Sequence, residues 1–326
     1  MSDSTLPPYL LTPSHDKYLK ALPPVDMSLL TIDILRKVYP RQSSDIFPKV
    51  DVLEERVKIP AKNKEGVVYV DIYKPKNTTS DGPLPVLLFL PGGGWCIQPQ
   101  AIHSFVASKL SNESQCAVVL VDYSLSPEVK FPVALEECFS VLQWILDTDN
   151  SKQLSIDPNR IAVAGDSAGG NLAAALTILA KQRNLGDAIK RQILYYPILD
   201  ATWSTESYKE YGDKNYFSGL GFTQLMWKNY QPAEPESQNI LACPSKATLH
   251  DLQGLPPAFI VTSHLDTLRD EAEAYGRQLM MANIPVSTMR VMHAIHGFLS
   301  VDALFCEETF NVIDASVGVL RRTFNQ

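Results

Sequence analysis

Six short apolar runs are spread along the chain, and they constrain its fold more than any other feature. Runs of this length are typical of strands in a parallel sheet that is covered on both faces. Such a sheet needs connecting segments that return over its faces, so the runs also predict crossovers. They occupy Val86–Leu90, Ala117–Val121, Ile161–Ala164, Ile193–Tyr196, Ala258–Val261 and Val286–Val291.

Segments with apolar residues at helical spacing lie between many of these runs. Strands and helices that alternate along a chain predict an α/β fold, with a mostly parallel central sheet flanked by helices. A length of 326 residues fits one such domain with insertions. The predicted helices are Leu135–Leu146, Asn171–Ala180, Glu271–Met281 and Phe310–Leu320, and a hairpin of Val52–Pro60 with Val67–Pro75 precedes them.

Two segments do not follow this alternation. The first fifty residues contain several prolines and have a helix-and-loop character, and the stretch from about Trp203 to Cys243 is aromatic and polar. We expect both segments to lie over the sheet. They would form a helical cap, made of about 1–50 and an insertion at about 203–243, on a single domain that spans 1–326.

Composition and charge exclude several classes of protein. A net charge of −7 without a basic stripe argues against nucleic-acid binding. The N-terminal residues do not resemble a secretory signal, and no window approaches 18 apolar residues, so we expect no stable membrane association. Five scattered cysteines without a CxxC pair predict free thiols in a reducing compartment, and neither disulfides nor a zinc site. A cytoplasmic location fits these features.

One segment, Gly165-Asp166-Ser167-Ala168-Gly169, joins an apolar run to an alanine-rich helical pattern. A sharp strand–turn–helix needs backbone torsions that β-carbons on the flanking residues would obstruct, which explains the two glycines. The helix that follows directs its first amides at a forming oxyanion. Ser167 is therefore the candidate nucleophile. The alternative is a Gly-rich turn that only packs closely or binds a phosphate, but neither the phosphate-loop pattern nor GxGxxG is present.

A nucleophilic serine needs a base, and the base needs an acid that orients it. On turns of this type, the acid and then the histidine follow the serine along the chain, after later strands. Only His293 and His296 follow the last predicted strand, and Gly297 provides a turn directly after His296. We therefore predict His296 as the base and His293 as a strand-end residue. The other histidines lie too early in the chain: His15, His103, His250 and His264.

Three aspartates are candidates for the orienting acid. Asp266 follows the predicted strand Ala258–Val261 and precedes a helix, which is the place expected for the acid. Asp200 follows the preceding strand, where some hydrolases carry their acid. Asp270 stands at the start of the helix. We predict Asp266 as the acid and local backbone capping for Asp200 and Asp270.

A glycine-rich loop, Pro91-Gly92-Gly93-Gly94-Trp95, directly follows the strand Val86–Leu90. Glycines allow backbone amides to point inward toward a reacting group. We therefore expect this loop to form the oxyanion hole, and a merely flexible turn is the alternative.

With these parts in place, the chain resembles the hormone-sensitive-lipase-like branch of the α/β-hydrolases. The likeness runs from about Val86 to Phe298. Asp266 with Leu268-Arg269-Asp270-Glu271 is similar to the family's D-P-L-R-D-E, with Thr267 in place of proline. The other matching motifs are Gly165–Asn171, His296-Gly297-Phe298, and Asp122–Glu128 followed by Phe131-Pro132-Val133-Ala134. The resemblance implies an α/β-hydrolase fold.

One residue departs from the family pattern. The family's H-G-G-G appears here as Pro91-Gly92-Gly93-Gly94. Proline has no amide hydrogen, but the amides of the following glycines remain free. The resemblance implies the amides of Gly93, Gly94 and Ala168 as oxyanion donors. We expect a working hole whose loop is supported in another way.

The activity implied is that of a serine carboxylesterase that hydrolyses short- to medium-chain esters through an acyl-enzyme, with no metal or organic cofactor. Trp95 and Phe298 adjoin the predicted site in sequence and are candidates for substrate contact, although both could be core residues. An amide or arylformamide hydrolase or a deacetylase on the same triad stays open. A non-catalytic small-molecule receptor is less favoured because His296 is present. A homodimer through the edge strand Val286–Val291 also stays open.

Overall fold

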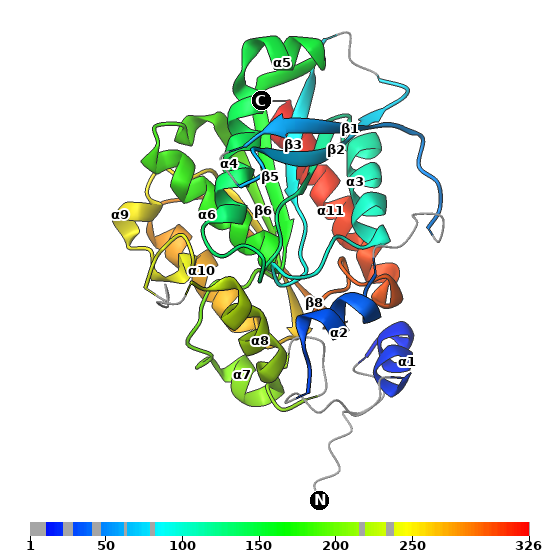
Figure 1. The fold of residues 1–326 in the computed structure, drawn as a ribbon, viewed down its shortest axis with the longest axis vertical. Helices are drawn as coiled ribbons and strands as arrows, with labels where there is room; N and C mark the ends of the chain where they lie inside the picture. The colour runs from blue at the N-terminus through cyan, green and yellow to red at the C-terminus, as the bar shows by residue number, and fades with distance from the viewer. Residues whose placement is uncertain are drawn as a thin grey trace, which may run out of the picture.

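The computed structural model describes residues 11–21, 29–40, 47–61, 64–78, 82–214, 219–232 and 238–325. These residues form an eight-stranded sheet in the order β1-β2-β4-β3-β5-β6-β7-β8 (Figure 1). The pairs β1–β2 and β2–β4 are antiparallel, and the remaining pairs are parallel. The strands are β1 (Val52–Pro60), β2 (Val67–Pro75), β3 (Leu84–Leu90), β4 (Ala117–Asp122), β5 (Ile156–Asp166), β6 (Ile189–Tyr195), β7 (Ala258–Leu265) and β8 (Val286–Ile295). The predicted hairpin and the mostly parallel sheet are confirmed.

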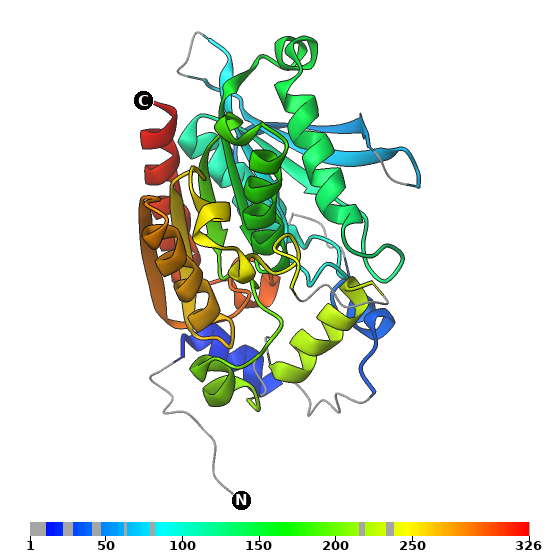
Figure 2. The ribbon, with the colours of Figure 1, turned by 90° about the vertical axis from the view of Figure 1, so that its left-hand side faces the viewer.

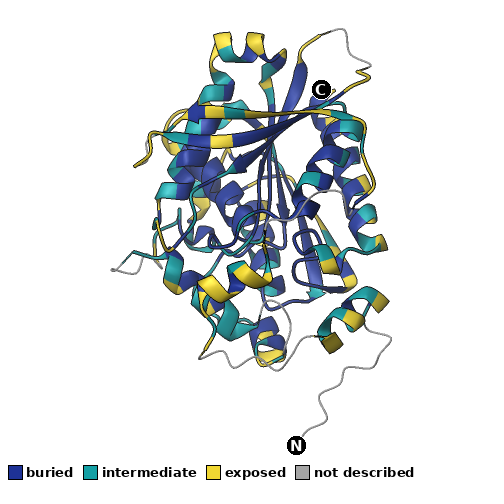
Figure 3. Cartoon of the chain, turned by 45° about the vertical axis from the view of Figure 1, so that its right-hand side comes forward, coloured by how far each residue is buried: buried dark blue, intermediate teal, exposed yellow. Residues whose placement is uncertain are grey.

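Both faces of the central strands are buried, which explains why their sequences are continuously apolar. In β3, Val86 and Leu88 pack into one hydrophobic cluster with helices α4, α6 and α10, whereas Leu87 and Phe89 pack into a second with α3 and α11. Figure 3 shows the buried strands between these layers and the exposed residues of β1 at the edge. These helices are α3 (Ala101–Ser114), α4 (Val133–Leu146), α6 (Ala168–Gln182), α10 (Arg269–Met281) and α11 (Glu307–Phe324).

Four of these five helices contain the four predicted helical segments, and α3 is the exception. Most positions of α3 are buried, on more than one side of the helix. A helix buried all round has no polar stripe, so its sequence lacks the periodic contrast that predicts a helix. Two short helices away from the site, α5 (Thr148–Gln153) and α9 (Leu249–Leu252), complete the layers.

Four further helices lie together at the carboxyl ends of the parallel strands (Figures 1 and 2). Two come from the N-terminal segment and two from the aromatic insertion. A small cluster joins the two pairs, because Ile32 and Leu35 of α2 pack with Met226 of α8 and with Cys96 and Ile97. The helices are α1 (Pro13–Ala21), α2 (Ile32–Val38), α7 (Glu206–Tyr211) and α8 (Leu220–Tyr230). Parts of the expected cap, at 1–10, 22–28, 41–46, 215–218 and 233–237, lie outside the described residues.

Candidate active site

Ser167 stands between β5 and α6 with a φ of 55° and a ψ of −118°. This left-handed φ is unusual for serine, and such strain concentrates at active sites. A Cβ on Gly165 would overlap the carbonyl oxygen of Gly169, and a Cβ on Gly169 would overlap that of Leu90. The two glycines therefore let the turn close on itself and against β3, as their positions around Ser167 predict.

The structure brings Ser167, Asp266 and His296 together from the ends of β5, β7 and β8. His296 Nε2 lies 2.8 Å from Ser167 Oγ, and His296 Nδ1 lies 2.8 Å from Asp266 Oδ2. An imidazole with its proton on Nδ1 donates to the carboxylate and leaves Nε2 free to accept the serine proton. Asp266 is fully buried and His296 nearly so, which shields both hydrogen bonds from water. The geometry can therefore deprotonate Ser167 during its attack on a carbonyl carbon.

The other candidate acids and the other late histidine have local partners instead. Asp200 accepts hydrogen bonds from Ser245 Oγ at 2.8 Å and Lys246 Nζ at 3.0 Å. Burial opposes ionisation of Asp200, but these donors outweigh it and lower its pKa. Asp270 accepts from the amide of Ser207 at 2.8 Å. His293 is exposed in β8, three residues before His296.

The acid is fixed by its own loop. The amide of Leu268 donates to Asp266 Oδ1 at 3.0 Å, so each carboxylate oxygen of Asp266 has a partner. The amide of Arg269 also donates to the main-chain oxygen of Asp266 at 3.3 Å. These bonds hold the carboxylate in the orientation that the imidazole needs, because a rotated carboxylate would lose both.

The glycine-rich loop lies beside Ser167, and its glycines line the same cavity. Gly93 and Gly94 have φ values of 120° and 60°, in a region that L-residues rarely adopt. Among the described residues, no acceptor is bonded to the amide of Gly93 or of Gly94. Ala168 is the first residue of α6, so its amide lacks an intrahelical partner. These three amides are therefore the candidate oxyanion donors among the described residues.

Pro91 leaves the loop well supported. The hydroxyl of Tyr123 donates to the carbonyl of Pro91 at 2.6 Å, and the amide of Gly92 donates to Asp166 Oδ1 at 2.9 Å. On the far side, Trp95 stacks on Tyr230 of α8 with a centroid distance of 4.1 Å. The loop is therefore held from the sheet side and from the insertion without a histidine at position 91.

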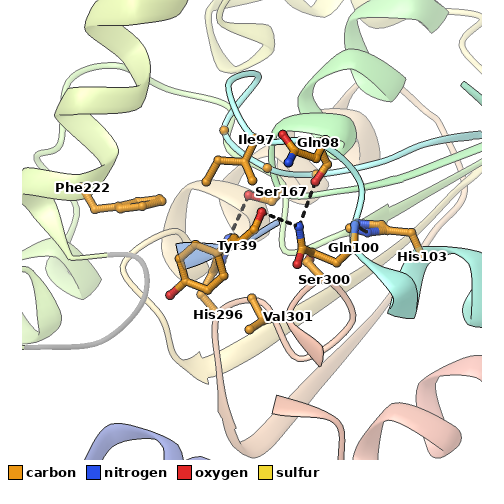
Figure 4. Close-up of a pocket in the computed structure, with 13 residues that line it drawn as sticks. Tyr39, Ile97, Gln98, Gln100, His103, Ser167, Phe222, His296, Ser300 and Val301 are labelled. Carbon is orange, nitrogen blue, oxygen red and sulfur yellow. Dashed lines mark hydrogen bonds between the residues drawn. The ribbon is translucent and has the colours of Figure 1, made fainter. Parts of the chain in front are cut away.

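A small cavity of about 30 Å³ opens beside Ser167. Figure 4 shows Phe222 of α8 and Tyr39, the residue after α2, near Ser167 and His296 at this cavity. This cavity has space for one or two atoms the size of a methyl group or water. It is lined by Tyr39, Gly92, Gly93, Gly94, Ile97, Gln98, Gln100, His103, Ser167, Phe222, His296, Ser300 and Val301.

The two aromatic residues suggested for substrate contact lie elsewhere. Trp95 is fully buried in its stack with Tyr230 and Trp227, and Phe298 is fully buried against Tyr196. Neither lines the cavity, so the structure does not support their expected contact with substrate and places both in the core.

The cavity residues that sequence reasoning missed come mainly from segments without a motif. Tyr39 and Phe222 lie in the two irregular segments, and Ser300 and Val301 follow the histidine motif by a few residues. Aromatic enrichment in the insertion was the one available signal, and it does not distinguish Phe222 from its neighbours.

The described residues lack two features of other protein classes. They contain no cluster of three or more histidine, cysteine, aspartate or glutamate side chains arranged to hold a metal ion. None of their helices is long and apolar enough to cross a membrane. All five cysteines are free, as their spacing predicts.

Comparisons with known proteins identify the family of this chain. Residues 87–300 match the model of a family described by its alpha/beta hydrolase fold. An arylesterase of Saccharolobus solfataricus is 35% identical over 254 residues, which cover 77% of this chain and 79% of that protein. A carboxylesterase of Mycobacterium tuberculosis is 35% identical over 219 residues, which cover 67% of each protein.

Solved structures give the same result. A fungal esterase from Rhizomucor miehei superposes with a TM-score of 0.88 at 34% identity, over 96% of each chain. A thermostable esterase from Pseudomonas putida also reaches 0.88, at 28% identity over 98% of this chain and 99% of that one. The chain therefore belongs to the hormone-sensitive-lipase-like esterases of the α/β-hydrolase superfamily, and it is a serine carboxylesterase.

Proposed function

We propose that the reaction proceeds through an acyl-enzyme on Ser167. Ser167 Oγ attacks the ester carbonyl while His296 Nε2 takes its proton and then returns it to the leaving alcohol. Asp266 holds the imidazole and stabilises its protonated form. Water attacks the acyl-enzyme in the second half, with His296 again as the base. The observation that carries this proposal is the continuous relay of Ser167, His296 and Asp266, with both hydrogen bonds at 2.8 Å.

The amides of Gly93, Gly94 and Ala168 bind the tetrahedral oxyanion in this proposal. Donors of this kind are each worth about 3 kcal/mol in transition-state stabilisation. Their support here is conformational: the positive φ of both glycines and the first position of Ala168 in α6 leave the three amides without acceptors in the described part of the chain.

We further propose that the substrates carry short acyl chains. The cavity beside Ser167 is small and is closed by the side chains of Tyr39, Ile97, Phe222 and Val301. We assign Tyr39 and Phe222 to a cap made by the N-terminal segment and the 203–243 insertion, on one catalytic domain. The contacts of α2 with α8 support this division.

The location and assembly of the enzyme are also proposals. Five free cysteines support a reducing compartment such as the cytoplasm, without stable membrane association. The edge position of β8 in the sheet supports a homodimer formed by strand pairing. A monomer mass in light scattering at about micromolar concentration would contradict the homodimer.

Hydrolysis of p-nitrophenyl esters from acetate to palmitate tests the proposed function, with wild type and Ser167→Ala measured side by side. We expect kcat/KM to be highest at the short chains and to fall at least about tenfold by octanoate, because even one methylene that a site cannot hold costs about tenfold or more. We expect Ser167→Ala to abolish the activity. A p-nitroanilide series with the same acyl groups runs in parallel. Faster anilide hydrolysis, or ester activity retained by Ser167→Ala, would contradict the proposal.

A further inference from the structure

The carboxylate of Asp166, beside the nucleophile, is fully buried and does not take part in the triad. Its Oδ1 accepts the amide of Gly92 at 2.9 Å, and its Oδ2 accepts the hydroxyl of Ser300. A Cβ on Gly92 would overlap Asp166 Oδ2, so the glycine loop packs directly on this carboxylate. Asp166 thus touches the oxyanion loop one residue before Gly93, while it is itself one residue before Ser167.

Ser300 extends this contact to the histidine loop. Because its only hydroxyl proton goes to Asp166, Ser300 Oγ must accept from the hydroxyl of Tyr196, which lies 2.9 Å away. Tyr196 in turn accepts the amide of Leu299 at 2.9 Å. The ring of Tyr196 also packs edge-on against His296, with a centroid distance of 4.8 Å. The chain of bonds has one direction, from the amide of Leu299 to the carboxylate.

His103 approaches the same carboxylate from α3. The amide of Gln100 donates to His103 Nδ1 at 2.9 Å, which leaves the imidazole proton on Nε2. His103 Nε2 lies 3.3 Å from Asp166 Oδ1 and makes no geometrically regular hydrogen bond there. The side chain is 1% exposed, so this is a buried electrostatic contact and weaker than that of Ser300.

These residues, Gly92, His103, Asp166, Tyr196 and Ser300, form one buried group that we call the Asp166 network. It joins the oxyanion loop, the serine turn and the histidine loop, which otherwise come from separate strand ends. We infer that Ser300 is a positioning residue, with His103 in a lesser role, and that both set the oxyanion amides through Asp166. This network would supply the loop support that position 91, a proline here, does not give.

Ser300→Ala is the principal variant, and this inference rests on the proposed ester hydrolysis. Displacement of catalytic groups by about 1 Å costs on the order of 100-fold in rate. We therefore expect kcat on p-nitrophenyl acetate to fall about 10- to 100-fold while KM changes less than about threefold, because the amides bind the oxyanion and not the ground state. His103→Leu should lower kcat less than Ser300→Ala, by about 3- to 10-fold.

Ser316 is a matched control for Ser300, because its partner Tyr195 directly precedes Tyr196, the partner of Ser300. The hydroxyl of Tyr195 donates to the buried Ser316 at 2.9 Å, just as Tyr196 pairs with Ser300, but Ser316 donates to a helix carbonyl of Val312 and not to Asp166. Ser316→Ala should lower the Tm without changing kcat. Ser300→Thr keeps the hydroxyl at a position that lines the cavity, so it should restore most of the wild-type kcat.

A second readout isolates the oxyanion hole. A methyl trifluoromethyl ketone adds to the active serine, and its tetrahedral oxyanion then occupies the hole. Its Ki should rise in Ser300→Ala by a factor similar to the loss in kcat/KM, and a purely structural role of Ser300 would not produce this match. If Ser300→Ala does not fold, Ser300→Cys replaces it, since a thiol is a weak donor of similar size.

The outcomes separate this inference from the proposed function. One result would overturn the inference and leave the proposed function standing. In it, Ser167→Ala loses the activity, but the folded Ser300 variant and His103→Leu keep the wild-type kcat and Ki. Equal losses in Ser300→Ala and Ser316→Ala would also overturn it. Failure of Ser167→Ala to abolish activity would overturn the proposed function instead.

Discussion

The two sides of the active-site cavity are held by different kinds of contact. On the sheet side, Ser167, Asp266 and His296 stand at strand ends, and backbone amides and buried carboxylates fix the loops around them. On the cap side, Gln100 Nε2 donates to the carbonyl of Tyr39 at 3.1 Å, and the hydroxyls of Tyr39 and Tyr18 lie 2.7 Å apart. We infer from this difference that catalytic rate and substrate range depend on separate parts of the molecule. Mutations should therefore affect them separately.

A charged residue of α2 links the cap to the sheet side. Arg36 of α2 donates to the carbonyls of Cys96 and Ser126 at 2.8 and 2.9 Å, and it forms a bidentate pair with Glu128. Cys96 lies two residues beyond Gly94 in the oxyanion loop. The cap therefore contacts the catalytic loop directly, although it contributes no member of the triad.

The largest expected effect is on the sheet side, at the catalytic base. His296→Ala removes the group that accepts the serine proton, so kcat should fall on the order of 10⁴- to 10⁶-fold. His293→Ala is the matched control, because His293 is exposed in β8, which ends just before His296, and its loss should leave kcat within about twofold. Steady-state kinetics on p-nitrophenyl acetate measure both. A severe loss of kcat in His293→Ala, with kcat retained in His296→Ala, would show that His293 and not His296 is the base.

The acid should show the next largest effect. Asp266→Asn leaves the size of the side chain unchanged but favours the wrong tautomer of His296, and kcat should fall on the order of 10³- to 10⁴-fold. Asp200 follows the preceding strand, β6, and its carboxylate pairs with Lys246. Asp200→Asn should therefore lower kcat less than about threefold, with a small loss of stability. Comparable losses of kcat in both variants would break the assignment of the acid.

On the cap side, Tyr39→Ala should change specificity more than rate. Removal of the ring enlarges the cavity, so kcat/KM for the hexanoate ester should rise about tenfold relative to that for acetate. Tyr18→Phe removes only the hydroxyl bonded to Tyr39 and should leave the chain-length profile nearly unchanged. The ratio of kcat/KM values along the ester series is the measurement. An unchanged ratio in Tyr39→Ala would show that the cap does not set the acyl limit.

The smallest effect is the pH dependence of stability through Glu271, which binds the segment that leads from β6 into the insertion. Burial raises the pKa of Glu271 well above its ordinary value of 4.5, although the amides of Leu199 and Asp200 partly oppose this. The unfolded chain releases this proton near pH 4.5, whereas the folded protein retains it to higher pH. The folded state therefore binds more protons, and stability falls as pH rises from 4.5 toward the folded pKa.

Glu271→Gln tests this dependence. Glutamine keeps an acceptor for the Leu199 amide and has no proton to lose, so the Tm of the variant should gain on the wild type as pH rises from about 5 to about 8. Calorimetric scans at several pH values give the difference. A Tm difference that is constant over this range would contradict a raised pKa of Glu271.

The sequence predicts the triad on the sheet side of the cavity but not the residues that line it on the cap side. Strand ends in parallel sheets meet at one edge, so an ordered set of serine, aspartate and histidine after successive apolar runs predicts their meeting in space. Ser167, Asp266 and His296 were found in this way, and the glycines around Ser167 show close approaches that explain them.

The cavity could not be predicted in the same way. Tyr39 reaches it through the packing of α2 on α8 and through Gln100, which are contacts between segments far apart in sequence. Trp95 illustrates the opposite case, since it adjoins the oxyanion glycines in sequence but turns away to stack on Tyr230. Its φ of 59° reverses the chain there, and no periodicity encodes such a reversal.

In the proposed reaction, Ser167 attacks the ester carbonyl. A fluorophosphonate labels a serine only where a base and an oxyanion hole activate it. After treatment of the wild type and Ser167→Ala, digestion and mass spectrometry should find one phosphonyl group on the peptide that contains Ser167, and none on the variant. Esterase activity should fall in proportion to the label. Labelling at another residue that parallels the loss of activity would contradict Ser167 as the nucleophile. Full activity after complete labelling of Ser167 would contradict it as well.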